Sequence, residues 1–285
     1  FCSGTALLNG LPMAGSKIYS FAQGSSVQAP PSLTVYYGDV TARYVSYADV
    51  LRLSFVADRL TYSFPDGSPA ITDLSFSTRE GKLTGILGAS GTGKTTLLNL
   101  LSGLLKPESG DIRINGTSIY SRSDRLDGVI GYVPQDDLLV EELTVFDNLF
   151  YAASLCLAGR SRKELTAIVN QTLVMLGLYE KRNYRVGSPL DKIISGGQRK
   201  RLNIALELVR EPSVLFLDEP TSGLSSRDSE NVIDLLHDLT FKGKLVITVV
   251  HQPSSEIFKG FDNVLVLDQN GHMVFYGNPI EAIVH

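Results

Sequence analysis

A glycine-rich segment that could hold phosphate groups runs from Gly88 to Thr95 and reads GASGTGKT, which fits the pattern GxxxxGK[ST]. Its glycines let successive backbone N–H groups curl around phosphate oxygens at the start of a helix, where the helix dipole also favours anions. In such a loop Lys94 reaches the β- and γ-phosphates of ATP, and the Thr95 hydroxyl is a ligand of Mg²⁺. The alternative, a plain glycine-rich turn, is disfavoured because an apolar run precedes the loop and a helical stretch follows it. The expected contacts to ATP within the loop are Gly88, Ser90, Gly91, Gly93, Lys94, Thr95 and Thr96.

Two neighbouring carboxylates, Asp218 and Glu219, end a second apolar run that begins at Val214. Ligands of open α/β folds sit at the carboxyl edge of the sheet, where these side chains would lie. Asp218 is suited to holding Mg²⁺, and Glu219 to polarising the attacking water as a general base. Acidic residues could simply cap the next turn, but this alternative loses force beside the phosphate loop. The two motifs together predict a P-loop NTPase.

A second possible anion cradle runs from Ile194 to Gln198 and reads ISGGQ, followed by a helical pattern with Leu202, Ala205, Leu206 and Val209 on one side. Two phosphate cradles with one carboxylate strand would be redundant unless a second protomer completes the site. The basic run from Arg199 to Arg201 could contact a phosphate backbone, but we expect it to be a solvated helix face.

At these residues the sequence resembles the ABC ATPase family, whose signature motif is LSGGQ, with Ile194 here in place of leucine. The resemblance covers about Phe55 to Gly277. It implies that two cassettes, identical or different, dimerise head to tail. Each ATP would then lie between the P-loop of one cassette and the signature of the other. The residues expected to face the partner's ATP are Ser195, Gly196, Gly197 and Gln198.

Three further positions resemble functional residues of that family. Gln135 matches the loop glutamine that touches Mg²⁺ or the attacking water, although a glutamine after proline is by itself usually an ordinary loop residue. His251 matches the switch histidine that senses the γ-phosphate, and its place after the carboxylates outweighs a purely structural role. Phe64 matches the aromatic residue that stacks on adenine, with Tyr62 as the competing choice and core packing as the alternative for either. The resemblance thus makes Thr95, Gln135 and Asp218 the metal ligands, and Glu219, His251 and Gln135 the catalytic residues.

One position departs from the family pattern, because Ser225 stands where the family usually has an aspartate after the catalytic glutamate. A serine cannot supply the carboxylate that helps to link the two sites in that family. The sequence from His251 to Pro253, followed by Phe261-Asp262 and the segment Gly271 to Gly277, is most similar to the type G, or White, subfamily. In that subfamily the cassette precedes the membrane domain.

Apolar strands alternate with helical stretches from about Arg52, a pattern typical of a parallel sheet. These elements must position the site residues. Buried strands are expected at Leu83 to Leu87, Val214 to Leu217 and Leu245 to Val250. Asn270-Gly271 predicts a two-residue hairpin that joins two further strands at Val264 to Leu267 and Met273 to Tyr276. Helices are expected from Thr96 to Leu101 and, with capping boxes at Thr144 and Ser161, in an all-helical insert over about 136–194. The predicted fold is α/β: a mixed or parallel core sheet of the ABC type with an antiparallel β part and this insert.

The expected domain division is 1–51 and 52–285. The first part has short apolar stretches broken by Gly, Asn and Pro, which predicts a β-rich accessory segment or linker. It weakly resembles the last strands of a forkhead-associated domain, through Gly4-Thr5, Asn9-Gly10 and Gly24.

Composition narrows the class of function. The formal net charge of −4 gives no general attraction to nucleic acid, and no stretch approaches the ~20 apolar residues that cross a bilayer. We therefore expect an ATPase that drives a transporter, for export in preference to import, at the cytoplasmic face of a membrane. The membrane domain would follow this chain.

The rival is a soluble ABC ATPase acting on nucleic acid or ribosomes, which usually has two cassettes or a long coiled-coil insert. A regulatory module without turnover is a third alternative, but it would be expected to lack Glu219 or His251.

Overall fold

The computed structural model describes residues 7–8, 11–13, 26–29, 33–36, 53–121, 128–188 and 193–284. The chain divides into two compact units, Phe1–Arg52 and Leu53–His285. This division lies next to the boundary expected from the change in sequence texture.

The first unit contains a small antiparallel sheet with the strand order β2-β1-β3-β4. Its strands are β1 (Leu7–Leu8), β2 (Leu11–Pro12), β3 (Ser26–Ala29) and β4 (Leu33–Tyr36). Short strands were expected here. The glycines and asparagine that carry the forkhead-associated resemblance lie outside the described residues.

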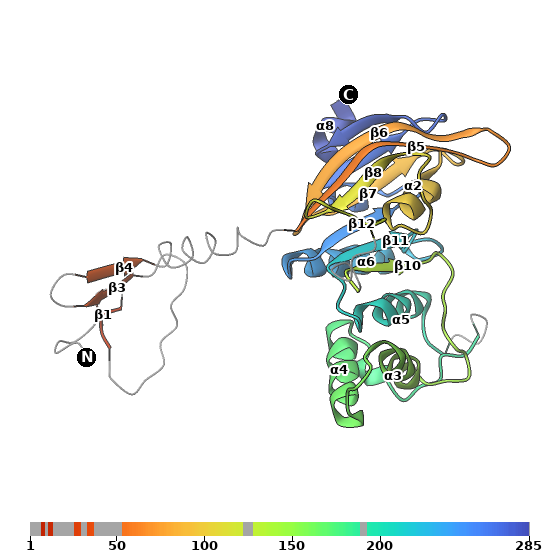
Figure 1. Ribbon diagram of the computed structural model, residues 1–285. Helices are drawn as coiled ribbons and strands as arrows, with labels where there is room; N and C mark the ends of the chain where they lie inside the picture. The colour runs from red at the N-terminus through yellow and green to blue at the C-terminus, as the bar shows by residue number, and fades with distance from the viewer. Residues whose placement is uncertain are drawn as a thin grey trace. The chain divides into compact units, whose positions relative to one another are not determined.

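A six-stranded sheet forms the centre of the second unit, with the order β10-β11-β12-β7-β13-β14 (Figure 1). The first five strands are parallel neighbours, and β14 pairs antiparallel with β13. The predicted core strands are confirmed. The bounds are β7 (Leu83–Gly88), β10 (Ile130–Val133), β11 (Val214–Asp218), β12 (Leu245–Val249), β13 (Asn263–Leu267) and β14 (Met273–Gly277).

Helices cover both faces of this sheet, which explains why β11 and β12 are buried along their whole length. On one face α2 (Lys94–Leu101) packs into a cluster with Phe216 and Ile247. On the other face α5 (Gly196–Leu208) and α6 (Ser226–Phe241) pack with Leu215 and Val246. Adjacent strand residues therefore face opposite cores. Two short helices, α7 (Ser255–Lys259) and α8 (Pro279–Val284), complete the unit.

A second, antiparallel sheet with the order β6-β5-β8-β9 lies against the core sheet on the α2 side (Figure 1). Phe55 on β5 packs edge-on against Phe216 of β11, with ring centroids 5.8 Å apart. The antiparallel part expected from the family resemblance is thus present. Its strands are β5 (Ser54–Ser63), β6 (Pro69–Arg79), β8 (Ser109–Ile114) and β9 (Thr117–Ser118).

The helical insert between β10 and α5 contains α3 (Val145–Cys156), α4 (Arg162–Met175) and the 3-10 turn η3 (Tyr179–Lys181). Ser161 and Glu164 form the complete capping box that the sequence predicts. Thr144 also caps its helix, accepting the Asp147 N–H at 3.0 Å, but its hydroxyl donates to the Asp147 carboxylate. The helices were therefore predicted correctly, while only one of the two boxes is reciprocal.

The hairpin between β13 and β14 has a wider loop than the predicted two-residue turn. The Asp268 carboxylate accepts the backbone N–H groups of Asn270 and His272, both at 2.9 Å, so five residues separate the strands. Gly271 has φ +71°, and a Cβ there would lie 1.9 Å from the Ala70 carbonyl oxygen. The tip is thus shaped by close contact with β6. Among the described residues, no helix is both long and apolar enough to cross a membrane.

Candidate functional site

Four adjacent parallel strands carry the predicted site residues at or just past their carboxyl ends. In the strand register Val133 is opposite Leu217, Asp218 is opposite Val249, and Val249 is opposite Ile86. The glutamine loop after β10, the carboxylates of β11, the histidine after β12 and the P-loop after β7 therefore meet at one sheet edge. This is the edge where open α/β sheets bind ligands.

The P-loop connects β7 to α2, which begins at Lys94 and not at Thr96 as the sequence suggested. Gly93 has φ +85°, and a Cβ there would lie 2.7 Å from the Ala70 carbonyl oxygen, so the turn requires glycine. The Lys94 side chain is buried inside the loop, where its ammonium donates to the carbonyl oxygens of Gly88 at 3.1 Å and Ala89 at 2.7 Å. The loop thus holds a positive charge at the start of a helix, the arrangement that attracts phosphate.

The P-loop and the end of β11 are joined directly, because the Thr95 hydroxyl donates to the Asp218 carboxylate at 3.2 Å. Asp218 is buried, and this desolvation raises the pKa of its carboxyl; the Thr95 hydrogen bond opposes the rise and the nearby Glu219 charge adds to it. Burial also raises the pKa of Tyr132 to about 12, with the Asp218 charge as a further cause. A cation at Asp218 would relieve this unfavourable burial of negative charge.

The oxygen atoms of Thr95 and Asp218 fit a magnesium ion, which prefers hard oxygen ligands and usually takes one or two carboxylates plus phosphate and water. Across the described ranges no group of three or more His, Cys, Asp or Glu side chains could hold a metal ion by itself.

Glu219 lies beside Gln135, whose side-chain amide donates to the Glu219 carboxylate at 3.2 Å. The Glu219 backbone has φ 44°, a left-handed conformation that costs a non-glycine residue about 1–3 kcal/mol. A turn that bonds the Ser222 N–H to the Glu219 carbonyl oxygen at 3.1 Å holds it there. The strained backbone and the glutamine together fix where this carboxylate points.

His251 lies two residues beyond β12, exposed at the same edge. It is followed by Gln252, which also has a left-handed backbone, with φ 44°. His251 is placed near the site by the register of β12 with its neighbours β11 and β7.

The signature segment starts α5 with a capping box that the sequence analysis missed. The Ser195 hydroxyl accepts the Gln198 N–H at 3.2 Å, and the Gln198 side chain accepts the Ser195 N–H at 2.9 Å. The pattern Ser-x-x-Gln was visible in the sequence as the same signal used at Ser161. Gln198 therefore has a structural role in addition to any ligand contact.

Gly197 is buried where the start of α5 meets the start of α6, and a Cβ there would lie 2.7 Å from the Asp228 carboxylate. Ser225 caps α6 by accepting the Asp228 N–H at 3.2 Å and donating to the Asp228 carboxylate at 2.9 Å. Serine and aspartate are both strong N-cap residues, so the departure from the family pattern preserves the helix start.

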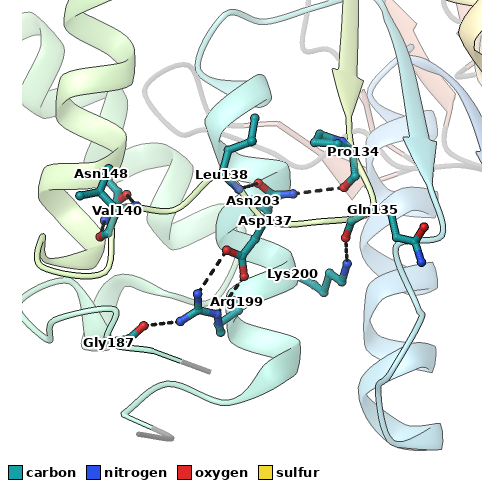
Figure 2. Close-up of polar contacts among 10 residues, drawn as sticks. All are labelled: Pro134, Gln135, Asp137, Leu138, Val140, Asn148, Gly187, Arg199, Lys200 and Asn203. Atoms are coloured by element: carbon teal, nitrogen blue, oxygen red, sulfur yellow. Dashed lines mark hydrogen bonds and ion pairs between the residues drawn. The ribbon is translucent and has the colours of Figure 1, made fainter. Parts of the chain in front are cut away.

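The prediction of a solvated face at residues 199–201 is wrong. Arg199 is only 6% exposed and pairs with Asp137 through two hydrogen bonds of 2.9 and 3.2 Å (Figure 2). Lys200 is half-buried and donates to the Gln135 carbonyl oxygen, and burial lowers the pKa of its ammonium while nearby Asp137 and Asp136 oppose that shift. The Arg201 guanidinium donates to the Leu176 carbonyl oxygen at 3.1 Å. The three cations hold α5 to its neighbours, a role that charge patterning alone did not reveal.

Phe64 follows β5 and is 42% exposed, with its ring edge-on to Tyr62 at 6.1 Å. Tyr62 is half-buried against the core of the antiparallel sheet and pairs with Ile71 of β6. The neighbouring Ala70 touches the P-loop at Gly93. Phe64 is thus the more accessible aromatic face near the P-loop.

We expect Phe64→Ala to weaken ATP and GTP binding alike, because stacking on an aromatic ring hardly discriminates between bases. Stacking is worth about 1–3 kcal/mol per base, so each dissociation constant should rise at least about fivefold. Titration with fluorescent analogues of both nucleotides measures this. Tyr62→Ala is the matched comparison, and a loss with Tyr62→Ala but not with Phe64→Ala would move the stacking role to Tyr62.

Comparison with known proteins gives consistent matches. A family model described as ABC transporter matches residues 71–222. The chain is 38% identical over 261 residues to ABC transporter G family member 22 of Arabidopsis thaliana, covering 90% of this chain and 32% of that protein. It is 41% identical over 209 residues to the protein scarlet of Drosophila melanogaster, covering 71% and 31%. The chain therefore spans about a third of the length of these curated relatives.

Among solved structures, cbiO1 of Clostridium perfringens, described as part of the ABC transporter complex cbiONQ, superposes with a TM-score of 0.71 at 30% identity. The match covers 81% of this chain and 90% of that one. The fold prediction is confirmed.

Proposed function

This chain belongs to the ABC transporter family, as an ATP-hydrolysing nucleotide-binding domain of type G, and from that premise we propose that it powers export through a membrane domain. That domain would follow this cassette in the full-length protein, with the cassette at the cytoplasmic face of the membrane. The observation that carries the proposal is the paired geometry at one sheet edge. There Thr95 contacts Asp218 and Gln135 contacts Glu219, each at 3.2 Å.

In this proposal the P-loop binds the phosphates of ATP. Backbone N–H groups between Gly88 and Thr96 face the phosphate oxygens, and the Lys94 ammonium leaves its loop carbonyls for the β- and γ-phosphates. Thr95, Asp218 and Gln135 would hold Mg²⁺, which would supply positive charge to the phosphates when bound. Phe64 stacks on the base.

Glu219 is the general base of the proposed mechanism. Its carboxylate accepts a proton from the attacking water, and the Gln135 amide, already bonded to it, fixes the carboxylate and the water relative to each other. His251, at the end of the neighbouring strand, contacts the γ-phosphate. The raised pKa of Asp218 reflects burial that a cation offsets, so its carboxylate remains available for the metal.

The second phosphate cradle completes the site of a partner cassette. Ser195 and Gly196 are exposed at the start of a 13-residue helix, so the Gly196 backbone N–H and the helix dipole can face an anion outside this chain, while the Ser195 N–H is held by Gln198. The Ser195 hydroxyl and the Gly197 backbone would contact the γ-phosphate of the partner's ATP. Each site then needs two chains, whether identical or different.

The rival function, a nucleic-acid or ribosome ATPase, has no observation in its favour. Between Gln135 and Ser195 the described helices are α3 with 12 residues and α4 with 14, which is far from a long coiled-coil arm. The acidic balance of the whole chain also gives no general attraction to nucleic acid.

We expect turnover by the isolated chain to be slow and to rise more than linearly with protein concentration, because each working site needs Ser195 to Gly197 from a second chain. ATPase assays over a wide range of concentrations test this. Ser195→Glu should lower the rate at every concentration, since its charge would repel the partner's γ-phosphate. It also removes the hydroxyl that caps α5, so thermal unfolding must show that the variant is folded. A rate per chain that is independent of concentration and of Ser195→Glu would count against a shared site.

A further inference from the structure

The loop after β10 is held along its length by one face of α5 (Figure 2). Asn203 accepts the Leu138 N–H at 3.1 Å and donates to the Pro134 carbonyl oxygen at 3.4 Å. Arg199, one helical turn earlier, pairs with Asp137. These two side chains fix both sides of Gln135 without touching it.

Lys200 makes the one described side-chain contact from α5 to Gln135 itself. Its ammonium donates to the Gln135 backbone carbonyl oxygen, while the Gln135 side-chain amide donates to Glu219. Four carboxylates act on the charge of Lys200: those of Asp136, Asp137, Asp218 and Glu219. The lysine therefore contacts the glutamine loop and feels the negative charge of the site, although it belongs to the signature helix.

The contacts that Arg199 and Lys200 make with the glutamine loop have different consequences. Arg199 with Asp137 is a bidentate pair, which sets the path of the loop and contributes to the stability of the fold. Lys200 instead acts on the backbone orientation of a single residue whose amide touches the proposed general base. A hydrogen bond from a charged donor is stronger than a neutral one, so this contact biases that orientation.

We propose that Lys200 is a positioning residue for hydrolysis in its own chain, which holds the Gln135 carbonyl so that the Gln135 amide stays on Glu219. This inference rests on the roles proposed above for Gln135 and Glu219. It gives α5 two functions: the helix start, at Ser195, serves the partner's ATP, and Lys200 serves the ATP of its own chain. If binding to the partner's nucleotide moves the start of α5, that movement would reach Gln135 through Lys200 on the same helix.

The first test replaces Lys200 with methionine, which keeps the length of the side chain and removes its charge. We expect kcat to fall about tenfold, as loss of one charged hydrogen bond predicts, with the KM for ATP and the thermal unfolding midpoint nearly unchanged. Lys200→Arg, which retains the charge and donors, should recover most of the rate. Lys163→Met, on the exposed face of α4, is the matched control and should leave turnover as it is. An unchanged kcat in Lys200→Met would overturn the inference.

The second test shows whether Lys200 acts through Gln135. Gln135→Ala keeps the backbone carbonyl that Lys200 contacts but removes the amide that this contact positions, so adding Lys200→Met to Gln135→Ala should cost no further rate. A tenfold loss that persists in the Gln135→Ala background would overturn the inference and leave the proposed function intact. Full turnover in Glu219→Gln would instead count against the proposed function, so the two failures can be told apart.

Discussion

Glu219→Gln should lower ATP turnover by at least about 100-fold, because general-base catalysis contributes about 10² to 10⁴ in rate. The substitution keeps the shape of the side chain and its contact with Gln135 while removing the charge that accepts the proton. ATP binding should survive, since Lys94, Thr95 and Asp218 are untouched and one repulsion of the γ-phosphate is lost. Steady-state phosphate release and a separate binding titration measure the two effects.

The same variant should accumulate a closed dimer, because hydrolysis is the step that would normally reopen it. Size-exclusion chromatography with ATP and Mg²⁺ should show a dimer that ADP does not produce. Glu230→Gln, which neutralises an exposed carboxylate on α6, is the control and should behave as wild type. Full-rate turnover in Glu219→Gln would remove the residue from its role, and lost turnover without an ATP-dependent dimer would count against the shared site.

Lys94→Ala should weaken ATP binding about 10- to 100-fold, the range given by loss of a charged hydrogen bond of about 1.5–3 kcal/mol. The Lys94 ammonium is the buried cation of the P-loop, and no other charged side chain contacts the Gly88 and Ala89 carbonyl oxygens it holds in the described structure. A fluorescent ATP analogue measures the affinity, and the thermal unfolding midpoint shows whether the substitution also destabilises the fold. Lys163→Ala serves as the control for loss of a lysine. Unchanged affinity in Lys94→Ala would place the phosphates elsewhere.

The parts of this site that follow one another along the chain could be predicted from the sequence. The apolar runs ending at Leu87, Leu217 and Val250 are recognisable because strands covered on both faces must be apolar throughout. Parallel strands share one carboxyl edge, and the P-loop, Asp218 and His251 each come at the end of such a run, so their meeting there follows from the sequence pattern. Their order on that edge, with β12 between β11 and β7, required the structure.

The contacts between distant segments could not be predicted, because they depend on which side of α5 faces the glutamine loop. Arg199, Lys200 and Arg201 form a charged run that is usually solvated, and only the packing of α5 beside β10 turns two of them toward Pro134 to Leu138. The wider loop at Gly271 has a similar cause, since contact with Ala70 of β6 overrides the local turn preference.

The central claim, that each ATP site is built from two chains, is tested most directly by mixing two inactive variants. Ser195→Glu keeps its own Glu219 but damages the site of its partner, and Glu219→Gln keeps an intact signature but cannot hydrolyse. A mixed dimer holds one complete site, formed by Glu219 of the first chain and Ser195 of the second. The account predicts that the mixture turns over ATP well above the sum of the two variants measured alone. A mixture no more active than that sum, with both variants folded and binding ATP, would contradict it.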